Sequence, residues 1–353
     1  MNYVEPTALR FHKARLVNLA FHNQAADLCL QMINTTSKDL SFISSFLPKK
    51  YKADAAVLYA WCRRIYEIIN HLSADERSGA IERLNEELDA IYQKKPSLII
   101  TENNVLAAFR EMVRRRKIPR YYPQEFLEGI KMDILGKGYP NIYTLYKYCF
   151  RISSVIGLML CHVVGIRDSK ALNHIAHMGI AIQLTRICGE IRKDWKNNRL
   201  YLPIDMLKEQ GSDLTLSDRL KRDSSFNSHY DTFITSLEDV VTMASDQTLT
   251  EVQMPTSIYE PSKSVVVNLL KLAEIHYRLG FNGLKYLPWR ASLSIDSAAL
   301  MYRSMGRKLV SGNFDVYNPK PETSSMYLGW LTFRSAVGGG LRYLFTSICQ
   351  YIK

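Results

Sequence analysis

Two acidic side chains near the middle of the chain, Glu190 and Asp194, are spaced in a way that could hold a divalent cation. If this segment is helical, residues at i and i+4 lie on neighbouring turns of one face. Two carboxylates so close repel one another unless a cation lies between them, and Mg²⁺ prefers oxygen ligands that it can share with substrate phosphates. The spacing leaves a second interpretation open, in which both acids lie on a solvated helix edge and pair with Arg186 and Lys193.

A helix must position this acid pair, and the pattern of residues 177–203 predicts one. Apolar residues recur at helical spacing and predict a buried face made of Ile180, Leu184, Ile187 and Ile191. Polar residues form a second face about a quarter-turn away, made of Gln183, Arg186, Glu190 and Asp194. A polar face beside an apolar face is typical of a crevice between packed helices. The pattern therefore favours a site between helices over a surface that simply faces water.

The residues around the acid pair also form a long motif. It consists of Gly-x-Ala-x-Gln-Leu-Thr-x-Ile, then Glu-x-x-x-Asp, then Arg-x-Tyr-Leu-Pro, over Gly179, Ala181, Gln183, Leu184, Thr185, Ile187, Glu190, Asp194, Arg199, Tyr201, Leu202 and Pro203. This run resembles the second acid-rich motif of the squalene and phytoene synthase family. The resemblance implies an all-α isoprenoid synthase fold, a helix bundle around a central substrate cavity. It also implies that Mg²⁺, held by Glu190 and Asp194, helps to ionise an allylic isoprenyl diphosphate that Gln183, Arg199 and Tyr201 contact.

A second helix is predicted over residues 51–72, with Leu58, Cys62, Ile65, Ile69 and Leu72 on its buried face. Its run Trp-Cys-Arg-Arg-x-x-Glu is similar to the first acid-rich motif of the same family. Tyr66 and Asn70 stand in place of the two expected aspartates, and Glu67 is the acid that remains. A phenol and an amide are weak Mg²⁺ ligands beside a carboxylate. The alignment implies that Arg63, Tyr66, Glu67 and Asn70 line the substrate site; without it, this is a core helix with a polar rim.

Other parts of the chain match the family less completely. Ser37 and Lys38 resemble a Ser-Lys pair that lies close to a diphosphate, although Leu40 stands where an aromatic residue is usual. The helix predicted over about 142–165 resembles a segment whose tyrosine faces the reacting carbons, and Tyr148 is the matching residue; aromatic residues at helical spacing also suit a plain core. The likeness returns after residue 264, where it implies substrate contacts for Arg290 and Tyr302.

Departures from the family pattern bear on the chemistry. In the second motif Arg186 replaces an asparagine, Gly189 an arginine and Glu190 an aspartate. Arg186 and Lys193 could supply positive charge where fewer Mg²⁺ ions are held, because a guanidinium binds phosphate in a fork. We therefore expect a prenyltransferase that ionises a single allylic diphosphate and passes the cation to a non-isoprenoid acceptor or cyclises it. Head-to-head coupling of two prenyl diphosphates and a catalytically silent assembly role are the alternatives.

The composition indicates a large core and an anionic partner. The chain has 353 residues, 47% of them hydrophobic, with a formal net charge of +12 and a pI of about 9.3. Such a charge suits a diphosphate or an acidic membrane surface. We expect the basic run over residues 114–117 to be a solvated helix face, and no motif for nucleic acid accompanies it. Peripheral membrane contact, through basic faces or residues 341–352, stays open.

The remaining expectations concern organisation and location. The six cysteines lie in apolar stretches without metal-type spacing, which predicts reduced core thiols in a cytoplasmic protein. No run of 18 apolar residues and no signal-peptide pattern occurs, so the apolar segment 152–165 is interpreted as a core helix. We expect one helical domain over residues 1–353, with a first helix over 7–34, a polar insertion or lid at about 208–262 and an unassigned tail at 325–353.

Overall fold

The computed structural model describes residues 27, 29–31, 45–72, 74–136, 138–166, 168–197, 199–210 and 256–312. Within these ranges the regular elements are helices, and the sole β pairing is an isolated bridge between Tyr139 and Pro203. The all-α fold class is confirmed. The tail, most of the first predicted helix and most of the polar insertion lie outside the described residues. The single domain therefore stays a prediction.

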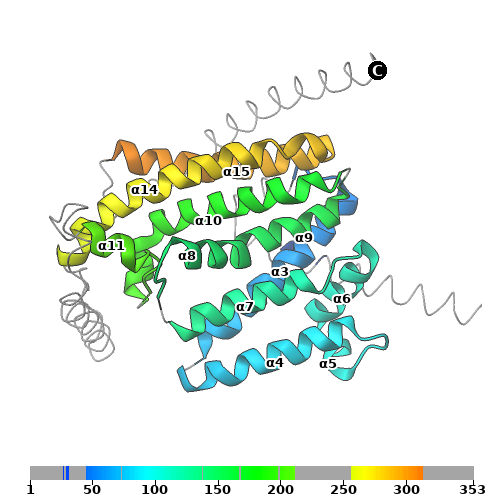
Figure 1. Cartoon of the computed structure of the whole chain (residues 1–353). Helices are drawn as coiled ribbons and strands as arrows, with labels where there is room; N and C mark the ends of the chain where they lie inside the picture. The colour runs from blue at the N-terminus through cyan, green and yellow to red at the C-terminus, as the bar shows by residue number, and fades with distance from the viewer. Residues whose placement is uncertain are drawn as a thin grey trace, which may run out of the picture.

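Helix α10 (Lys170–Lys196) lies in the middle of the bundle (Figure 1). It packs against α14 (Thr256–Phe281) and α15 (Trp289–Ser311) on one side, and against α8 (Ile142–Cys149), the π-helix η1 (Phe150–Ser154) and α9 (Val155–Val164) on the other. The remaining elements are α3 (Lys49–His71), α4 (Ala74–Tyr92), α5 (Leu98–Thr101), α6 (Asn104–Arg116), α7 (Tyr121–Leu135), α11 (Ile204–Gln210) and the 3₁₀-helix η2 (Leu284–Tyr286). The predicted acid pair thus belongs to the central helix.

Aromatic packing holds α3 against α6 and α7. The ring of Trp61 stacks on Phe109 with centroids 4.3 Å apart, and Phe126 packs on Trp61 at 5.5 Å. All three side chains are buried, and aromatic pairs of this kind stabilise by about 0.5–1.5 kcal/mol beyond the area they bury. Phe126 also meets Tyr66 edge-on at 5.8 Å. The same cluster that builds the core therefore fixes the orientation of Tyr66.

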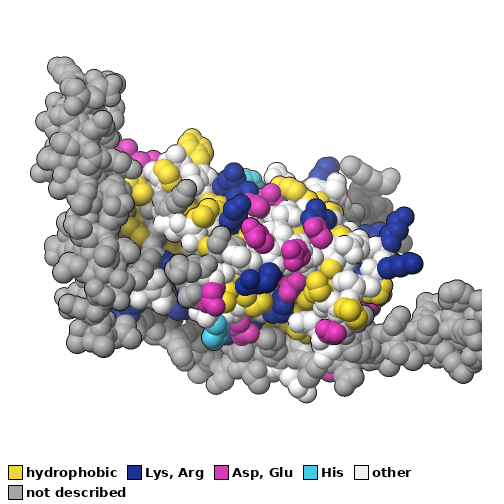
Figure 2. All heavy atoms as spheres, turned by 90° about the horizontal axis from the view of Figure 1, so that it is seen from below, with side chains coloured by type: hydrophobic (Ala, Val, Ile, Leu, Met, Phe, Trp, Pro, Cys, Tyr) yellow, Lys and Arg dark blue, Asp and Glu magenta, His cyan; other side chains and the backbone are white. Residues whose placement is uncertain are grey.

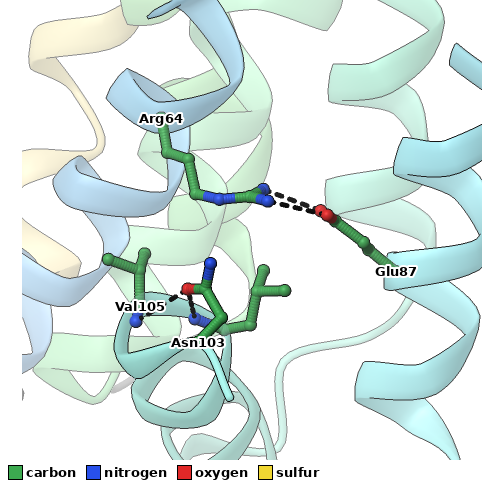
Figure 3. A network of polar contacts seen from close by, with 5 residues as sticks. Arg64, Glu87, Asn103 and Val105 are labelled. Atoms are coloured by element: carbon green, nitrogen blue, oxygen red, sulfur yellow. Dashed lines mark hydrogen bonds and ion pairs between the residues drawn. The ribbon is translucent and has the colours of Figure 1, made fainter. Parts of the chain in front are cut away.

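Polar contacts set the ends and the spacing of the outer helices. Arg64 of α3 binds Glu87 of α4 through two hydrogen bonds of 2.7 Å, as Figure 3 shows. Asn103 caps α6, because its side-chain oxygen accepts hydrogen bonds from the backbone N–H groups of Val105 and Leu106. A two-pronged arginine–carboxylate pair has a defined geometry. These contacts therefore fix where α4 and α6 lie relative to α3.

The basic run 114–117 is not simply a solvated face, so that expectation is wrong in part. Arg115 and Arg116 both bind the carboxylate of Asp54, which is only 1% exposed. A buried carboxylate needs such partners, since an unpaired charge in the interior is costly. Nearby, Arg120 binds Asp89. Figure 2 shows basic and acidic side chains interspersed on the lower face of the bundle.

The helix predicted over 142–165 has an interruption in its middle. Its five-residue π-helix, η1, ends at Ser154, whose backbone lies against Gly179 of α10. A Cβ atom at position 179 would lie 2.4 Å from the Cα of Ser154, so glycine is required for this approach. The hydroxyl of Ser154 also donates to the Ala176 carbonyl oxygen at 2.6 Å. This close contact between η1 and α10 fixes where Tyr148, which comes just before η1, lies along α10.

The apolar segment predicted as a core helix does occupy the core in large part. The helical stretch Ile142–Val164 is long and apolar enough to cross a membrane by length and composition, but 56% of its most apolar window is buried inside the protein. Core helices meet the same criterion. Five cysteines, Cys29, Cys62, Cys149, Cys161 and Cys188, are buried thiols of the core, as expected, and Cys349 lies outside the described residues.

Candidate active site

The acid pair lies on the polar face of α10, next to the apolar face that the sequence predicts. Leu184, Ile187 and Ile191 are buried, whereas Glu190 and Asp194 are half-buried. The Nε atom of Arg186 lies 3.3 Å from Oε2 of Glu190. The pairing that we considered as the alternative is therefore present for Glu190. Neither acid points freely into bulk solvent.

The crowding of charges around Asp194 makes its carboxyl group hard to ionise. Its pKa is raised to about 7, first by burial and then by the neighbouring Glu190, while Arg186, Lys193 and Arg199 act in the opposite direction. A carboxylate that is this hard to ionise gains from a nearby divalent cation. The described residues contain no group of three or more His, Cys, Asp or Glu side chains arranged for a metal. Two carboxylates alone could hold Mg²⁺ only if water and diphosphate oxygens completed its coordination, which is a usual arrangement for this ion.

Tyr66 of α3 lies close to Arg186, a positively charged side chain of α10. Burial raises the pKa of its phenol, and the guanidinium of Arg186 lowers it, so the two groups are close. Burial lowers the pKa of the Arg186 guanidinium, but Glu190 and the phenols of Tyr66, Tyr302 and Tyr148 together raise it by more, so the net shift is upward. In the position where relatives are expected to carry a metal-binding acid, this chain places a neutral ring beside an arginine.

A cluster of tyrosines surrounds a carboxylate next to this point. The hydroxyl of Tyr148 donates to Oδ2 of Asp133 at 3.0 Å, and that of Tyr201 donates to Oδ1 at 2.9 Å. The two rings are stacked with centroids 5.2 Å apart. Arg199 lies close to both phenols and to Asp133, and its backbone N–H donates to the Asp194 carbonyl oxygen at 2.8 Å. Tyr148, Arg199 and Tyr201 are thus brought together with the acid pair.

Two further predicted residues lie on the other side of the cluster. Tyr302 of α15 is close to both Arg186 and the buried Tyr277. The Tyr277 hydroxyl is 3.2 Å from that of Thr185 on α10. Gln183 is buried on α10, with 4% of its surface exposed. Together these contacts place the N-terminal part of α10's polar face inside the bundle rather than at its edge.

The structure does not bring every predicted residue to the acid pair. Arg63 and Glu67 form an exposed ion pair of 2.7 Å with each other on α3, and Asn70 is exposed. Arg290 donates from Nε to the Phe46 carbonyl oxygen at 2.9 Å and lies twelve residues before Tyr302, about 18 Å along α15 at 1.5 Å per residue. Ser37 and Lys38 lie outside the described residues. Lys193 is exposed but near enough to Asp194 to lower its pKa.

Asp133 is the member of the cluster that sequence reasoning missed as a site residue. Burial raises its pKa, against the charge of Arg199 and the hydrogen bonds from Tyr201 and Tyr148. A signal was present in the sequence. Phe126 and Ile130 are buried on α7, and Asp133 follows at the next position of the same face. An acid on an apolar helix face needs a partner, which marks it as a residue to examine.

The chain is similar to known proteins over most of its length. The description of the matching family is squalene/phytoene synthase, and residues 33–327 of the chain match it. The 15-cis-phytoene synthase of Paracoccus sp. (strain N81106 / MBIC 01143) is 25% identical over 319 residues, which cover 88% of this chain and 92% of that protein. The 15-cis-phytoene synthase of Enterobacter agglomerans is 26% identical over 293 residues, covering 82% and 87%.

Solved structures show the same fold. A dehydrosqualene synthase in complex with ligand superposes with a TM-score of 0.68 at 18% identity, covering 90% of this chain and 97% of that one. Squalene synthase HpnC from Alicyclobacillus acidocaldarius gives a TM-score of 0.64 at 15% identity, covering 85% and 97%. The isoprenoid synthase fold that the motifs imply is therefore confirmed. With the family match over most of its length, the chain belongs to the squalene/phytoene synthase family of prenyltransferases.

Proposed function

We propose that this prenyltransferase ionises one allylic isoprenyl diphosphate at the acid pair of α10 and passes the prenyl cation to an acceptor other than a second prenyl diphosphate, or back onto its own chain. The observation that carries the proposal is an asymmetry between the two motif helices. On α10, Glu190 and Asp194 form a crowded pair of carboxylates. On α3, the matching position presents the buried ring of Tyr66, and Glu67 is paired with Arg63 at the exposed edge.

The asymmetry matters because departure of a diphosphate depends on positive charge around it. Mg²⁺, when bound by Glu190 and Asp194, would stabilise the leaving diphosphate. Arg186 and Arg199 flank this acid pair and are suited to bind the remaining diphosphate oxygens, since guanidinium groups pair with phosphate in a fork. One such arrangement serves one leaving group. Two ionisations on two donors need more charge than the facing helix supplies.

The test is release of pyrophosphate from dimethylallyl, geranyl, farnesyl and geranylgeranyl diphosphate, with Mg²⁺ and with EDTA. The proposal expects Mg²⁺-dependent release from at least one donor, with the prenyl group recovered as a cyclised product or on an added aromatic or amine acceptor. A C30 or C40 hydrocarbon formed from two donors would contradict the single-donor proposal. Absence of release from all four donors would instead favour the catalytically silent alternative.

Head-to-head condensation is the second candidate, because a specific observation favours it. The Paracoccus and Enterobacter relatives carry the name 15-cis-phytoene synthase and match nearly their whole length. In this alternative, the cationic side chains Arg186 and Lys193 replace the metal charge that the missing aspartates would have held. The hydrocarbon product named above separates the two candidates in a single assay.

We propose that a peripheral membrane contact, expected through basic faces or residues 341–352, also includes the exposed tip at α5. Leu98 and Ile99 of α5 are 75% and 46% exposed, and the exposed Lys94 and Lys95 come just before them. An apolar tip with flanking lysines suits an acidic bilayer surface, although cytoplasmic location itself stays a prediction. We expect a Leu98→Ser, Ile99→Ser variant to lose co-sedimentation with vesicles containing phosphatidylserine. Leu135→Ser, at a position that is 54% exposed elsewhere, is the matched control and should still bind.

A further inference from the structure

Asp133, near the C-terminal end of α7, connects three separate segments of the chain. Each of its carboxylate oxygens accepts one phenolic hydrogen, from Tyr148 of α8 at 3.0 Å and from Tyr201, which follows α10, at 2.9 Å. Tyr148 and Tyr201 are buried, and Asp133 is half-buried. Nothing in the two acid-rich motifs accounts for this acid, which comes from a different helix.

The position of Asp133 is fixed by packing as well as by hydrogen bonds. One turn earlier on α7, a Cβ atom at Gly129 would lie 2.8 Å from Cδ1 of Ile152, so α7 and η1 are in close contact. Arg151 of η1 binds Glu125 of α7 at 2.9 Å and strengthens this contact. The Asp133 carboxylate therefore has little freedom to move, and its position determines where the hydroxyl groups of Tyr148 and Tyr201 lie.

The geometry determines what the phenols can offer to a ligand. A tyrosine hydroxyl has one hydrogen, and in both tyrosines that hydrogen is given to Asp133. The Tyr148 oxygen is then left with lone pairs only, whereas the Tyr201 oxygen also accepts a hydrogen bond from the Arg199 guanidinium. Donation to a carboxylate also increases the negative character of the oxygen, because such hydrogen bonds are charge-assisted. A prenyl cation is stabilised by lone pairs and ring faces and is repelled by an O–H dipole that points at it.

We propose that Asp133 is a positioning residue that holds Tyr148 with its oxygen lone pairs, rather than its hydrogen, available to the prenyl cation. Tyr201 binds the other carboxylate oxygen and keeps Asp133 in place. This inference rests on the proposed function, because it requires that the site generates such a cation. Asp133 acts through Tyr148 and leaves the diphosphate to the acid pair, Arg186 and Arg199. It therefore governs what happens to the cation after ionisation.

The test is Asp133→Asn, assayed with the donor that the wild-type enzyme turns over. The asparagine keeps the shape of the side chain, but its NH₂ group faces one phenol and forces that hydroxyl hydrogen to point elsewhere. We expect the ratio of prenyl alcohol, formed by capture with water, to all other prenyl products to rise roughly tenfold, the effect of about one charge-assisted hydrogen bond. Tyr201→Phe, which removes one donor and keeps the ring, should change the ratio in the same direction.

Product ratio is the informative measurement because it does not depend on how much of the enzyme is folded. Tyr92→Phe is the control for loss of a phenol hydrogen bond far from the site, since the Tyr92 hydroxyl donates to the Ile118 carbonyl oxygen at 3.1 Å. It should leave the ratio unchanged. An unchanged ratio in both Asp133→Asn and Tyr201→Phe, with release intact, overturns the inference and leaves the proposed function standing. Absence of release by the wild-type enzyme overturns the proposed function, and the inference with it.

Discussion

Arg186 and Glu190 lie one turn apart on α10, with the arginine Nε 3.3 Å from the glutamate Oε2. The arginine therefore neutralises one of the two acids that are proposed to hold Mg²⁺. An asparagine, which the family is expected to carry at position 186, could not do this. Arg186 thus supplies positive charge beside the acid pair, where a metal ion would otherwise be its main source. The Arg186–Glu190 pair therefore determines how the site should respond to mutation.

Removal of both acids should abolish ionisation. In Glu190→Ala, Asp194→Ala we expect pyrophosphate release to fall by at least about 100-fold, because electrostatic stabilisation of the leaving group is lost. Steady-state release with saturating donor and Mg²⁺ measures this. Glu260→Ala is the control, since Glu260 forms an exposed pair with Lys263 on α14. Release that persists at the wild-type rate in the double variant would show that the acid pair has no role.

Replacement of Arg186 by asparagine should separate metal binding from catalysis. Without the guanidinium, Glu190 and Asp194 repel each other more strongly, so we expect half-saturation at a lower Mg²⁺ concentration. The rate at saturating Mg²⁺ should nevertheless fall about tenfold or more, because a cation that binds the diphosphate is gone. A titration of release against Mg²⁺ gives both numbers. If the maximum rate is unchanged, Arg186 is only a partner of Glu190 and does not serve the diphosphate.

Much of the fold could be predicted from sequence because burial follows helical periodicity. Most of the faces predicted on α3 and α10 are buried as expected, including Ile65, Leu184 and Ile191, whereas Ile180 and Leu72 are half-buried. Local periodicity cannot show a π-helix, however, since the extra residue in η1 results from the close approach of Gly179 to Ser154, far away in sequence. The fate of the basic run was also not predictable, because the Asp54 that pairs with Arg115 and Arg116 lies on a different helix.

The site was predictable where its residues share one helix, and less so where they do not. Glu190 and Asp194 were found from i, i+4 spacing, since that spacing is fixed by the helix itself. Arg290 was placed by resemblance, yet its guanidinium contacts the Phe46 backbone far along α15 from Tyr302. Asp133 was missed because its partners, Tyr148 and Tyr201, come from other segments. Roles of this kind depend on tertiary contacts that no periodicity encodes.

Asp194 should make the stability of the metal-free protein depend on pH. Its pKa is raised to about 7 in the folded chain, first by burial and then by Glu190, whereas an unfolded aspartate titrates near 3.9. A raised pKa means that the folded state binds the proton more tightly, so stability falls as the pH rises from about 3.9 to about 7 and then levels off. In EDTA, Asp194→Asn should therefore raise the melting temperature at pH 8, with a smaller effect at pH 5 and little effect at about pH 4. A variant that is equally or less stable than wild type at pH 8 would contradict the raised pKa.

A second titratable pair lies away from the acids, between α10 and α14. The Nδ1 atoms of His177 and His276 are 2.9 Å apart, so one ring must donate a hydrogen and the other must accept it. Tyr146 of α8 faces His276 edge-on with centroids 5.1 Å apart, and His174 lies close enough to His177 to lower its pKa. The pKa of His276 is lowered to about 4, first by burial and then by His177. The pair is therefore held in its neutral form.

This histidine pair should destabilise the fold in acid. An unfolded histidine titrates near 6.5, and a group whose folded pKa lies below that value contributes stability that is lost as the pH falls from about 6.5 towards 4. We expect His276→Gln, whose amide can still bond to His177, to lose less of its melting temperature than wild type between pH 7 and pH 4.5, by about 1–2 °C after allowance for solvent screening. The exposed His71 gives the control, because His71→Gln should follow the wild-type curve. Parallel curves for His276→Gln and wild type would mean that the two rings adapt to protonation without cost, which the 2.9 Å separation of their nitrogens opposes.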